Sequence, residues 1–476
     1  MVFSSFSFLC YFLPFVFVVY FSFRNINTKN LFLLAASLFF YAWNDPKYLL
    51  IMLLVIFATY FGSLCVYTCH KQILKKLFLV LFLILIFSFL FYFKYFNFLV
   101  KIFEDVGYKK GNLIEIILPI GISFYTFQAV SYLLDVYRGM RPQKNLSNLA
   151  LYISLFPQLV AGPIVKYKTV AVALTERTHS IKNVYEGFVR FIIGLSKKIL
   201  IADTLAMSVD KIFETPIQEL SFSIVWVGII FYAFQIYFDF SAYSDMAIGL
   251  GRVFGFKFLE NFNYPYISKS ITEFWRRWHI SLSSWFKEYV YIPLGGSWYG
   301  LKKTLRNLLI VFFLTGLWHG AEYTFIAWGL WHGFFVMFEK IFLRIRKLFS
   351  FKISGLFFKT ILNLFLRCYV FAVVLIGWVF FRADNIQDAI LYLKAMCNKV
   401  SFTPDFYMGY YVSDGSWIVF SIAVILSLGF GKKCLNFMEK RFNTIFIRDM
   451  FLLFLLFLCV MFLTATSYSP FIYFHF

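Results

Sequence analysis

Long apolar runs constrain this chain more than any other feature. Segments close to the length of a bilayer crossing, about 20 residues, recur from its first residues to its last. These runs are apolar on every side, so they fit helices and not the alternating strands of a transmembrane barrel. We expect an all-α, polytopic membrane protein with about 10 to 13 transmembrane segments, plus re-entrant or interfacial helices. The expected apolar segments are 2–23, 31–43, 48–68, 77–98, 113–135, 184–205, 222–240, 308–318, 323–343, 358–381, 416–431 and 449–465.

The composition supports one membrane-embedded unit. Hydrophobic residues make up 61% of the chain and charged residues only 14%, whereas soluble domains contain about 25% charged residues. We therefore predict a single domain over 1–476, with N-terminal spans in 1–112, a core in about 113–343 and C-terminal spans in 344–476.

The net charge of +21 does not indicate nucleic acid binding. The lysines and arginines lie mainly in short loops between apolar segments, as the positive-inside rule predicts. The strongly basic loops follow the first, third and fifth segments, so we expect these loops to be cytoplasmic. The first segment would then begin on the other side, with the N-terminus outside. No metal-ligand spacing occurs among the cysteines and histidines, so we predict no metal site.

Some apolar segments are interrupted, and we expect them to be broken helices beside a passage. Two such segments are 113–165 and 237–251, and the alternative is ordinary kinks in packed helices. The long polar connections 252–306 and 382–415 are expected to be re-entrant or to lie on the surface. The interrupting residues in the first segment are Pro119, Gly121, Pro157, Gly162 and Pro163.

The stretch 273–333 gathers three of the six histidines in the chain, next to tryptophans. These residues are His279, His319 and His332, with Trp275, Trp278, Trp318 and Trp331 beside them. Residues 272–291 predict one amphipathic helix. Its apolar stripe would be Phe274, Trp278, Leu282, Trp285 and Tyr289, and its neighbouring face Arg276, His279, Ser283 and Lys287.

The cations Arg276, Arg277 and Lys287 of this helix suit an anionic partner. It could be the phosphates of a nucleotide-like donor, or lipid head groups beneath a helix that lies on the membrane surface. His319 ends an apolar helix and His332 lies on the next one. A buried histidine is either a hydrogen-bonded structural residue or a group that takes and returns a proton near pH 7.

Asp239 and Asp245 lie in an apolar stretch, where an ionised carboxylate needs a partner or a polar cavity. Six positions put them about 120° apart on a helix, so they do not form one carboxylate pair. Each either pins a neighbouring helix or takes part in a proton relay, which keeps proton-coupled transport open. No nucleophile elbow, P-loop, zinc or dinucleotide motif occurs.

Four segments together resemble the membrane-bound O-acyltransferase family, in its bacterial alginate O-acetylation branch. They are YFDFSAYSDMAIGLG (237–251), FWRRWHISLSSW (274–285), YIPLGG (291–296) and GLWHGAEYTFIAWGLWHG (316–333). The segment LPIGISFYTFQAVSYLLDVYRG (118–139) is similar to that branch as well.

The resemblance implies acyl transfer with His319 as the catalytic residue and His279 as a second polar residue of the site. His332, Trp318, Asp239 and Asp245 would support the core. It also implies acetyl-CoA as co-substrate without a bound cofactor, a periplasmic esterase-like partner and a location in the bacterial inner membrane. The acceptor would be a cell-envelope polysaccharide of the alginate or peptidoglycan kind.

Other functions stay open at this point. A D-alanyl or acyl transferase would use a carrier-protein thioester as donor, and a transporter would move its cargo without chemistry. An acyltransferase acting on a secreted peptide is a further alternative.

Overall fold

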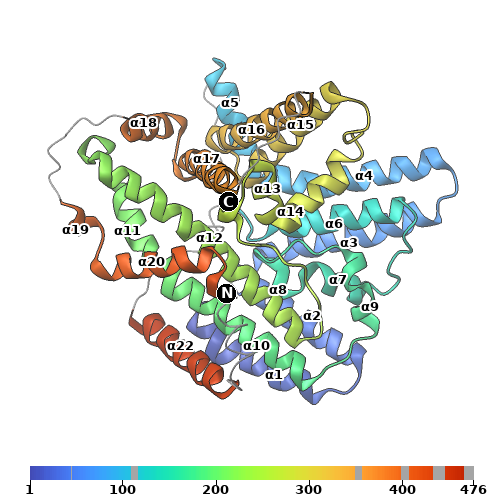
Figure 1. Ribbon diagram of the computed structural model, residues 1–476. Helices are drawn as coiled ribbons and strands as arrows, with labels where there is room; N and C mark the ends of the chain where they lie inside the picture. Colours follow the sequence, from blue (N-terminus) through green and yellow to red (C-terminus); the bar gives the residue numbers. More distant parts are fainter. Residues whose placement is uncertain (44, 109–115, 349–355, 398–406, 432–444, 466–476) are drawn as a thin grey trace. The chain divides into compact units, whose positions relative to one another are not determined.

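The computed structural model describes residues 1–43, 45–108, 116–348, 356–397, 407–431 and 445–465 (Figure 1). Within these ranges the chain is built from helices joined by loops, with no strand, which confirms the all-α prediction. Five described helices are long and apolar enough to cross a membrane. They are α3 (Lys47–Thr68), Gln72–Asp105, α12 (Phe222–Val253), Phe357–Arg382 in α17 and α22 (Ile445–Ala465).

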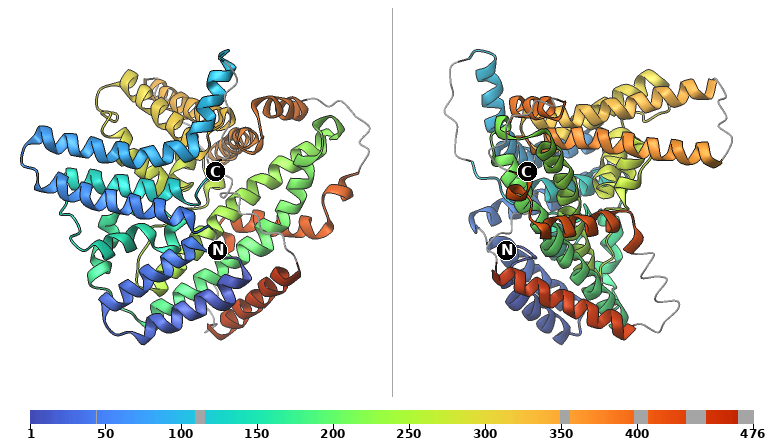
Figure 2. Two further views of the ribbon diagram at one scale, coloured as in Figure 1. Left: turned by 180° about the vertical axis from the view of Figure 1, so that it is seen from behind. Right: turned by 60° about the vertical axis from the view of Figure 1, so that its left-hand side comes forward.

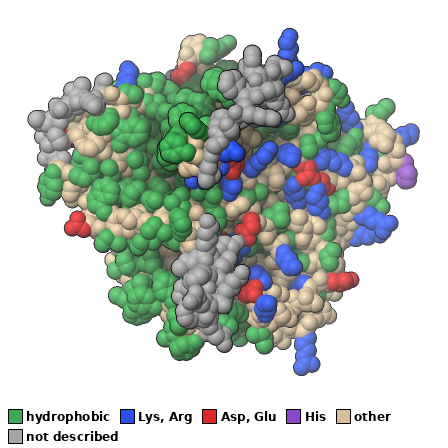
Figure 3. Space-filling view, viewed as in Figure 1, with side chains coloured by type: hydrophobic (Ala, Val, Ile, Leu, Met, Phe, Trp, Pro, Cys, Tyr) green, Lys and Arg blue, Asp and Glu red, His purple; other side chains and the backbone are tan. Residues whose placement is uncertain are grey.

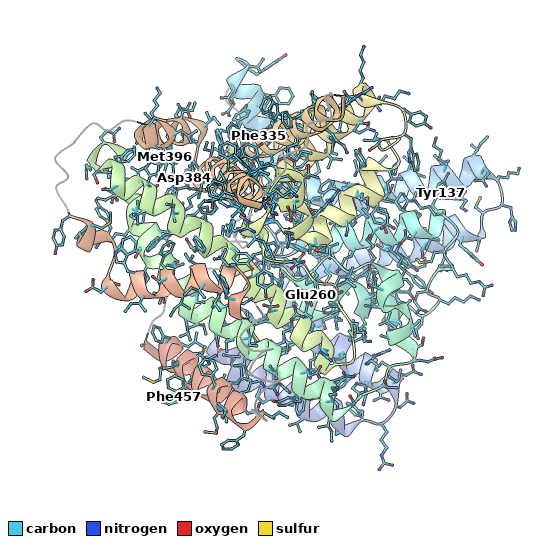
Figure 4. All side chains as sticks on the ribbon, viewed as in Figure 1. Tyr137, Glu260, Phe335, Asp384, Met396 and Phe457 are labelled. Carbon is cyan, nitrogen blue, oxygen red and sulfur yellow. The ribbon has the colours of Figure 1, made fainter. Side chains whose placement is uncertain are left out.

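Two shorter apolar helices, Phe8–Ser22 and Asp414–Ser427, accompany these five. The larger total of 10 to 13 crossings stays a prediction. Large apolar side chains remain exposed on the spans, as on α22, where Phe457 is 60% exposed (Figure 4). Hydrophobic side chains also cover much of the face in Figure 3. Such a surface suits lipid, because water would not tolerate an apolar area of this size.

The chain divides into two compact units. The first contains Met1–Leu195 and Tyr243–Glu260, and the second contains Ser196–Ala242 and Asn261–Phe476. Helix α12 contributes to both. The division into N-terminal, core and C-terminal parts of one domain stays a prediction.

The first unit contains the interrupted segment 113–165, and the breaks are present. Helix α6 (Ile122–Tyr137) begins after Gly121, whose φ of +77° a glycine adopts without strain. Pro157 lies in the first turn of the short helix α8 (Phe156–Leu159), which follows α7 (Leu146–Ser154). Residues 113–115 of the expected span lie outside the described ranges.

The predicted break in 237–251 is wrong, because this segment is part of the continuous helix α12. Its glycines permit close packing and do not interrupt the helix. A Cβ on Gly249 would come 2.6 Å from the carbonyl oxygen of Gly187 in α10 (Ile181–Ser196). A Cβ on Gly251 would come equally close to the ring of Phe258.

The second unit contains a helical hairpin, α15 (Leu301–His319) and α16 (Tyr323–Leu348), whose two helices lie side by side (Figure 2). The helices meet at glycines, since a Cβ on Gly329 would come 3.0 Å from the Cα of Gly316. Helix α17 (Leu356–Arg382) packs against α16. Two of the three histidines of the stretch 273–333 lie on this hairpin, His319 on α15 and His332 on α16.

The polar connections contain short helices. In 252–306 these include α13 (Ile271–Arg277), α14 (Ile280–Phe286) and the π-helical turn η6 (Lys287–Tyr291). In 382–415 they include α18 (Ile386–Cys397) and α19 (Met408–Tyr411), and residues 398–406 lie outside the described ranges. Helices of about 7 residues are too short to cross a bilayer.

Candidate active site

The structure brings His279, His319 and His332 into one buried cluster in the second unit. His279 lies between α13 and α14, His319 is the last residue of α15, and His332 lies in α16. None of the three is more than 2% exposed. The sequence separated them by up to 53 positions, and the helical hairpin closes that gap.

Histidine and tryptophan rings alternate through this cluster, which we call the His–Trp cluster. Its neighbouring rings have centroids 4.8 to 6.0 Å apart, within the range of aromatic contacts. In order, the rings are His279, Trp318, His319, Trp328, His332 and Trp275. Four of them come from the hairpin and two from the connection before it.

The prediction of one helix over 272–291 is wrong. Helix α13 ends at Arg277, and His279 has left-handed backbone angles, φ 43° and ψ 56°, before α14 begins. This break turns His279 away from Arg276 and Lys287, which are exposed, and buries its ring against Phe240 at 4.6 Å. The expected apolar stripe is nevertheless buried at each of its five positions.

Asn261 explains the break at His279, although it was not among the site residues expected from the sequence. Its backbone carbonyl accepts a hydrogen bond from the amide of Ile280 (2.9 Å). Its side-chain oxygen accepts from the amide of Ser281 (3.1 Å) and the hydroxyl of Ser281 (2.9 Å), and lies 3.1 Å from Nδ1 of His279. Asn261 therefore holds the first turn of α14.

The same contacts define the tautomer of His279. A backbone amide can only donate, so the amide of Ser281 requires the oxygen of Asn261 to face it. Nδ1 of His279 then carries the proton and donates to that oxygen, which leaves the lone pair on Nε2. This Nε2 is buried and has no hydrogen-bond partner among the described residues. Burial lowers the pKa of His279 to about 3, so the ring is neutral at pH 7.

His319 ends α15 within an aromatic pocket. Its ring contacts Trp318 (4.9 Å) and Trp328 (4.8 Å), and it packs against Phe381 of α17 at 5.3 Å. Arg382, which follows Phe381 in the sequence, lines a cavity of about 250 Å³. Asp384, labelled in Figure 4, lines the same cavity. His319 therefore lies at a helix end with aromatic rings packed around it.

His332 lies deeper among rings of the same cluster. Trp275 and Trp328 contact it edge to face at 5.2 and 5.3 Å, and Phe274 stacks at 6.3 Å. Neither of its ring nitrogens has a hydrogen-bond partner among the described residues, and the same holds for the indole N–H groups of Trp275 and Trp328. Buried polar atoms without a partner are costly, so these ring nitrogens and indole N–H groups are unusual for a protein interior.

Glu339 is a second residue of this region that was not expected from the sequence. It lies two turns after His332 on α16, and its carboxylate caps the start of α13. It accepts hydrogen bonds from the amide of Ile271 (2.5 Å) and from the amide (3.0 Å) and hydroxyl (2.8 Å) of Thr272. A carboxylate at a helix N-terminus also meets the positive end of the helix dipole. Glu339 therefore ties α13, which carries Trp275, to the helix of His332.

Asp239 and Asp245 bind different cations, as expected from their separation on the helix. Asp239 is buried and lies 2.7 Å from Nζ of Lys198, which also binds Asp203 at 2.7 Å. Asp245 lies 2.8 Å from Arg190. Both pairs join α12 to the helical stretch 181–214, which supports the interpretation that each aspartate pins a neighbouring helix.

The three cations predicted to suit an anionic partner, Arg276, Arg277 and Lys287, have different surroundings. Arg277 binds Glu273 at 2.9 Å and donates to the carbonyl oxygen of Asn263 at 3.0 Å, so its charge is used within the protein. Arg276 and Lys287 are exposed and remain accessible to an anion in solution.

The sequence is similar to a family of membrane enzymes and to several of its members. The family profile of membrane-bound O-acyltransferases matches residues 145–375. A probable alginate O-acetylase of Pseudomonas aeruginosa is 43% identical over 406 residues, which is 83% of this chain and 75% of that protein. A peptidoglycan O-acetyltransferase of Helicobacter pylori is 35% identical over 82% of this chain and 78% of its own length.

A teichoic acid D-alanyltransferase of Bacillus subtilis is 31% identical over a smaller part, 44% of this chain and 55% of that protein. The matched family region contains all three histidines of the His–Trp cluster. The apolar helices and these similarities together identify a multi-pass membrane acyltransferase, and the chain belongs to the membrane-bound O-acyltransferase family.

Proposed function

We propose that this protein transfers acetyl groups from cytoplasmic acetyl-CoA to a cell-envelope polysaccharide of the alginate or peptidoglycan kind. The observation that carries the proposal is the His–Trp cluster. In it three imidazole rings, which can accept and return a proton, are buried together among aromatic side chains. The names of the more similar relatives support acetyl as the group and a polysaccharide or peptidoglycan as the acceptor.

In this proposal His319 removes the proton from the acceptor hydroxyl, and the oxygen attacks the thioester carbonyl. The tetrahedral intermediate collapses, the C–S bond breaks, and the CoA thiolate takes the proton from His319. General base catalysis of this kind contributes about 10²–10⁴-fold. The buried indole N–H groups of Trp275 and Trp328 are candidate donors to the oxyanion, because they have no described partner in the resting protein. His279 and His332 orient the reacting groups.

The donor would approach the basic surface that contains Arg276 and Lys287, which suits the phosphates of CoA. The charge pattern of the loops supports a cytoplasmic position for this surface and an N-terminus outside, in the bacterial inner membrane. A periplasmic esterase-like partner would provide the hydroxyl that first accepts the acetyl group and would then pass the group to the polymer.

The test uses purified protein in nanodiscs with radiolabelled acetyl-CoA, the periplasmic partner and a polysaccharide acceptor. We expect wild type to cleave the thioester and transfer label, and His319→Ala to lose at least about 100-fold of this activity while still inserting into the membrane. His70→Ala is the matched control, because His70 is an exposed loop histidine, and it should keep full activity.

Full activity in His319→Ala would overturn the assignment of His319. If wild type were inactive with acetyl-CoA but active with an acyl or D-alanyl carrier-protein thioester, the proposed donor would be wrong. Cargo movement that survived in His319→Ala without thioester cleavage would indicate a transporter instead.

A further inference from the structure

Among the described residues of the first unit are two buried cations that have no acidic partner there. They are Lys29, in the first turns of α2 (Ile26–Ala42), and Arg177, in the loop after α9 (Tyr167–Thr175). Each side chain is only 8% exposed. Neither forms an ion pair within the described residues, and Glu176, the acid next to Arg177 in the sequence, is exposed and likewise unpaired. Buried charges are normally paired, so this arrangement needs an explanation.

Neutral groups hold the two cations in place. Arg177 donates from Nε to the hydroxyl of Tyr20 (2.9 Å) and from Nη1 to the side-chain oxygen of Asn30 (2.5 Å). Its Nη2 is buried and has no hydrogen-bond partner in the described structure. Lys29 Nζ lies over the ring of Tyr20 at 5.0 Å. The guanidinium of Arg177 lies over the same ring at 5.7 Å. This ring offsets part of the cost of burying the two cations and leaves their donors available.

The pKa of His179 shows that the electrostatic potential beside Lys29 and Arg177 is positive. Its Nε2 lies 2.8 Å from the hydroxyl of Tyr20, so it belongs to the same network. Burial, followed by the charges of Lys29 and Arg177, lowers its pKa to about 4. An anion bound here would oppose the effect of the two cations and raise the pKa of His179.

Other features of the surroundings also favour an anion. Helix α2 begins three residues before Lys29, and α10 begins two residues after His179, so two helix N-termini add their positive ends. Exposed hydroxyl and amide groups flank the cations in the sequence. These are Asn27, Thr28, Thr178 and Ser180.

We propose that Lys29 and Arg177, held by Tyr20 and Asn30, form a binding site for a phosphate group. The site belongs to the first unit and is distinct from the His–Trp cluster of the second. The phosphate comes either from the headgroup of an anionic phospholipid or from a soluble phosphorylated molecule such as CoA. Both sources offer the same chemistry, a phosphate oxygen that accepts charge-assisted hydrogen bonds from the ammonium and guanidinium groups.

The first experiment measures lipid retention by the full-length protein in nanodiscs, using native mass spectrometry. Phosphatidylglycerol is compared with phosphatidylcholine, and inorganic phosphate and CoA are titrated separately into phosphatidylcholine nanodiscs. Lys29→Met removes the charge and keeps an apolar stem on the Tyr20 ring. Lys182→Met is the matched control, since Lys182 is an exposed lysine in the first turn of α10.

We expect Lys29→Met to weaken binding by about tenfold or more and Lys182→Met to leave it unchanged. Preferential retention of phosphatidylglycerol would identify a lipid. Saturable binding of phosphate or CoA would identify a soluble ligand if Lys29→Met weakens it, because CoA binding at Arg276 and Lys287 should not depend on Lys29. Equal behaviour of the two variants, or no phosphate binding from either source, would overturn the proposal. NMR titration of the histidines tests the proposal on the wild-type protein alone, without any variant. A bound phosphate should raise the pKa of His179 from about 4.

Discussion

Gly377 of α17 lies directly against His332, so that a Cβ on Gly377 would come 2.6 Å from Nε2 of the imidazole. We therefore expect Gly377→Ala to displace the His332 ring. The overpacked contact should cost about 1–3 kcal/mol of stability and should lower acetyl transfer. Thermal unfolding in detergent and the nanodisc assay measure these two effects.

Gly415→Ala is the control for this change, because a Cβ there would meet only Oγ of Ser413 at 3.7 Å. Adding His332→Ala to Gly377→Ala should restore stability without restoring transfer. If the double variant were no more stable than Gly377→Ala, the steric explanation would be wrong.

The cap that Glu339 provides should matter for stability and for activity. Glu339→Ala leaves the amides of Ile271 and Thr272 without their acceptor, which should cost about 1–3 kcal/mol. Because α13 carries Trp275, transfer should fall as well. Glu339→Gln retains one acceptor oxygen and should recover part of both properties, whereas Lys340→Ala, an exposed neighbour, should change neither. Unchanged activity in a folded Glu339→Ala protein would show that the cap does not position the site.

The buried state of His279 predicts a loss of stability in acid. Its pKa is about 3 in the folded protein and about 6.5 when exposed, so below pH 6.5 the unfolded chain binds a proton that the folded chain does not. The free energy of unfolding should then fall by up to about 1.4 kcal/mol per pH unit, with no contribution from His279 above pH 6.5. Unfolding at pH 7.5 and 5.5 should show a smaller drop for His279→Gln than for wild type. Equal drops would mean that His279 is not buried in its neutral form.

Arg276 and Arg277 are neighbours in sequence, yet we expect their variants to differ. Arg276→Gln should raise the KM for acetyl-CoA several-fold and leave stability unchanged, because this side chain is exposed. Arg277→Gln should lower stability by about 1 kcal/mol, because it removes the contacts with Glu273 and Asn263. Steady-state kinetics and thermal unfolding of both variants separate the two effects, and identical results would contradict this assignment.

The sequence was sufficient to predict the all-α class, the buried stripe from Phe274 to Tyr289 and the separate partners of Asp239 and Asp245. Each of these follows from local periodicity or from the cost of burying a charge. The break at His279 could not be predicted, because Asn261, 18 positions upstream, determines it through tertiary hydrogen bonds. The role of Glu339 could not be predicted for the same reason. Nothing in the sequence around this carboxylate indicates that it caps α13, which lies 62 or more positions upstream.

The glycines that join α15 to α16 also have a consequence for the order of assembly. The two helices are made one after the other, and their association depends on the close backbone packing that Gly316 and Gly329 allow. The hairpin can therefore close while the ribosome is still producing α17. His319 and His332 would acquire their mutual arrangement at that stage, and the arrival of Gly377 would complete a pocket whose other walls already exist.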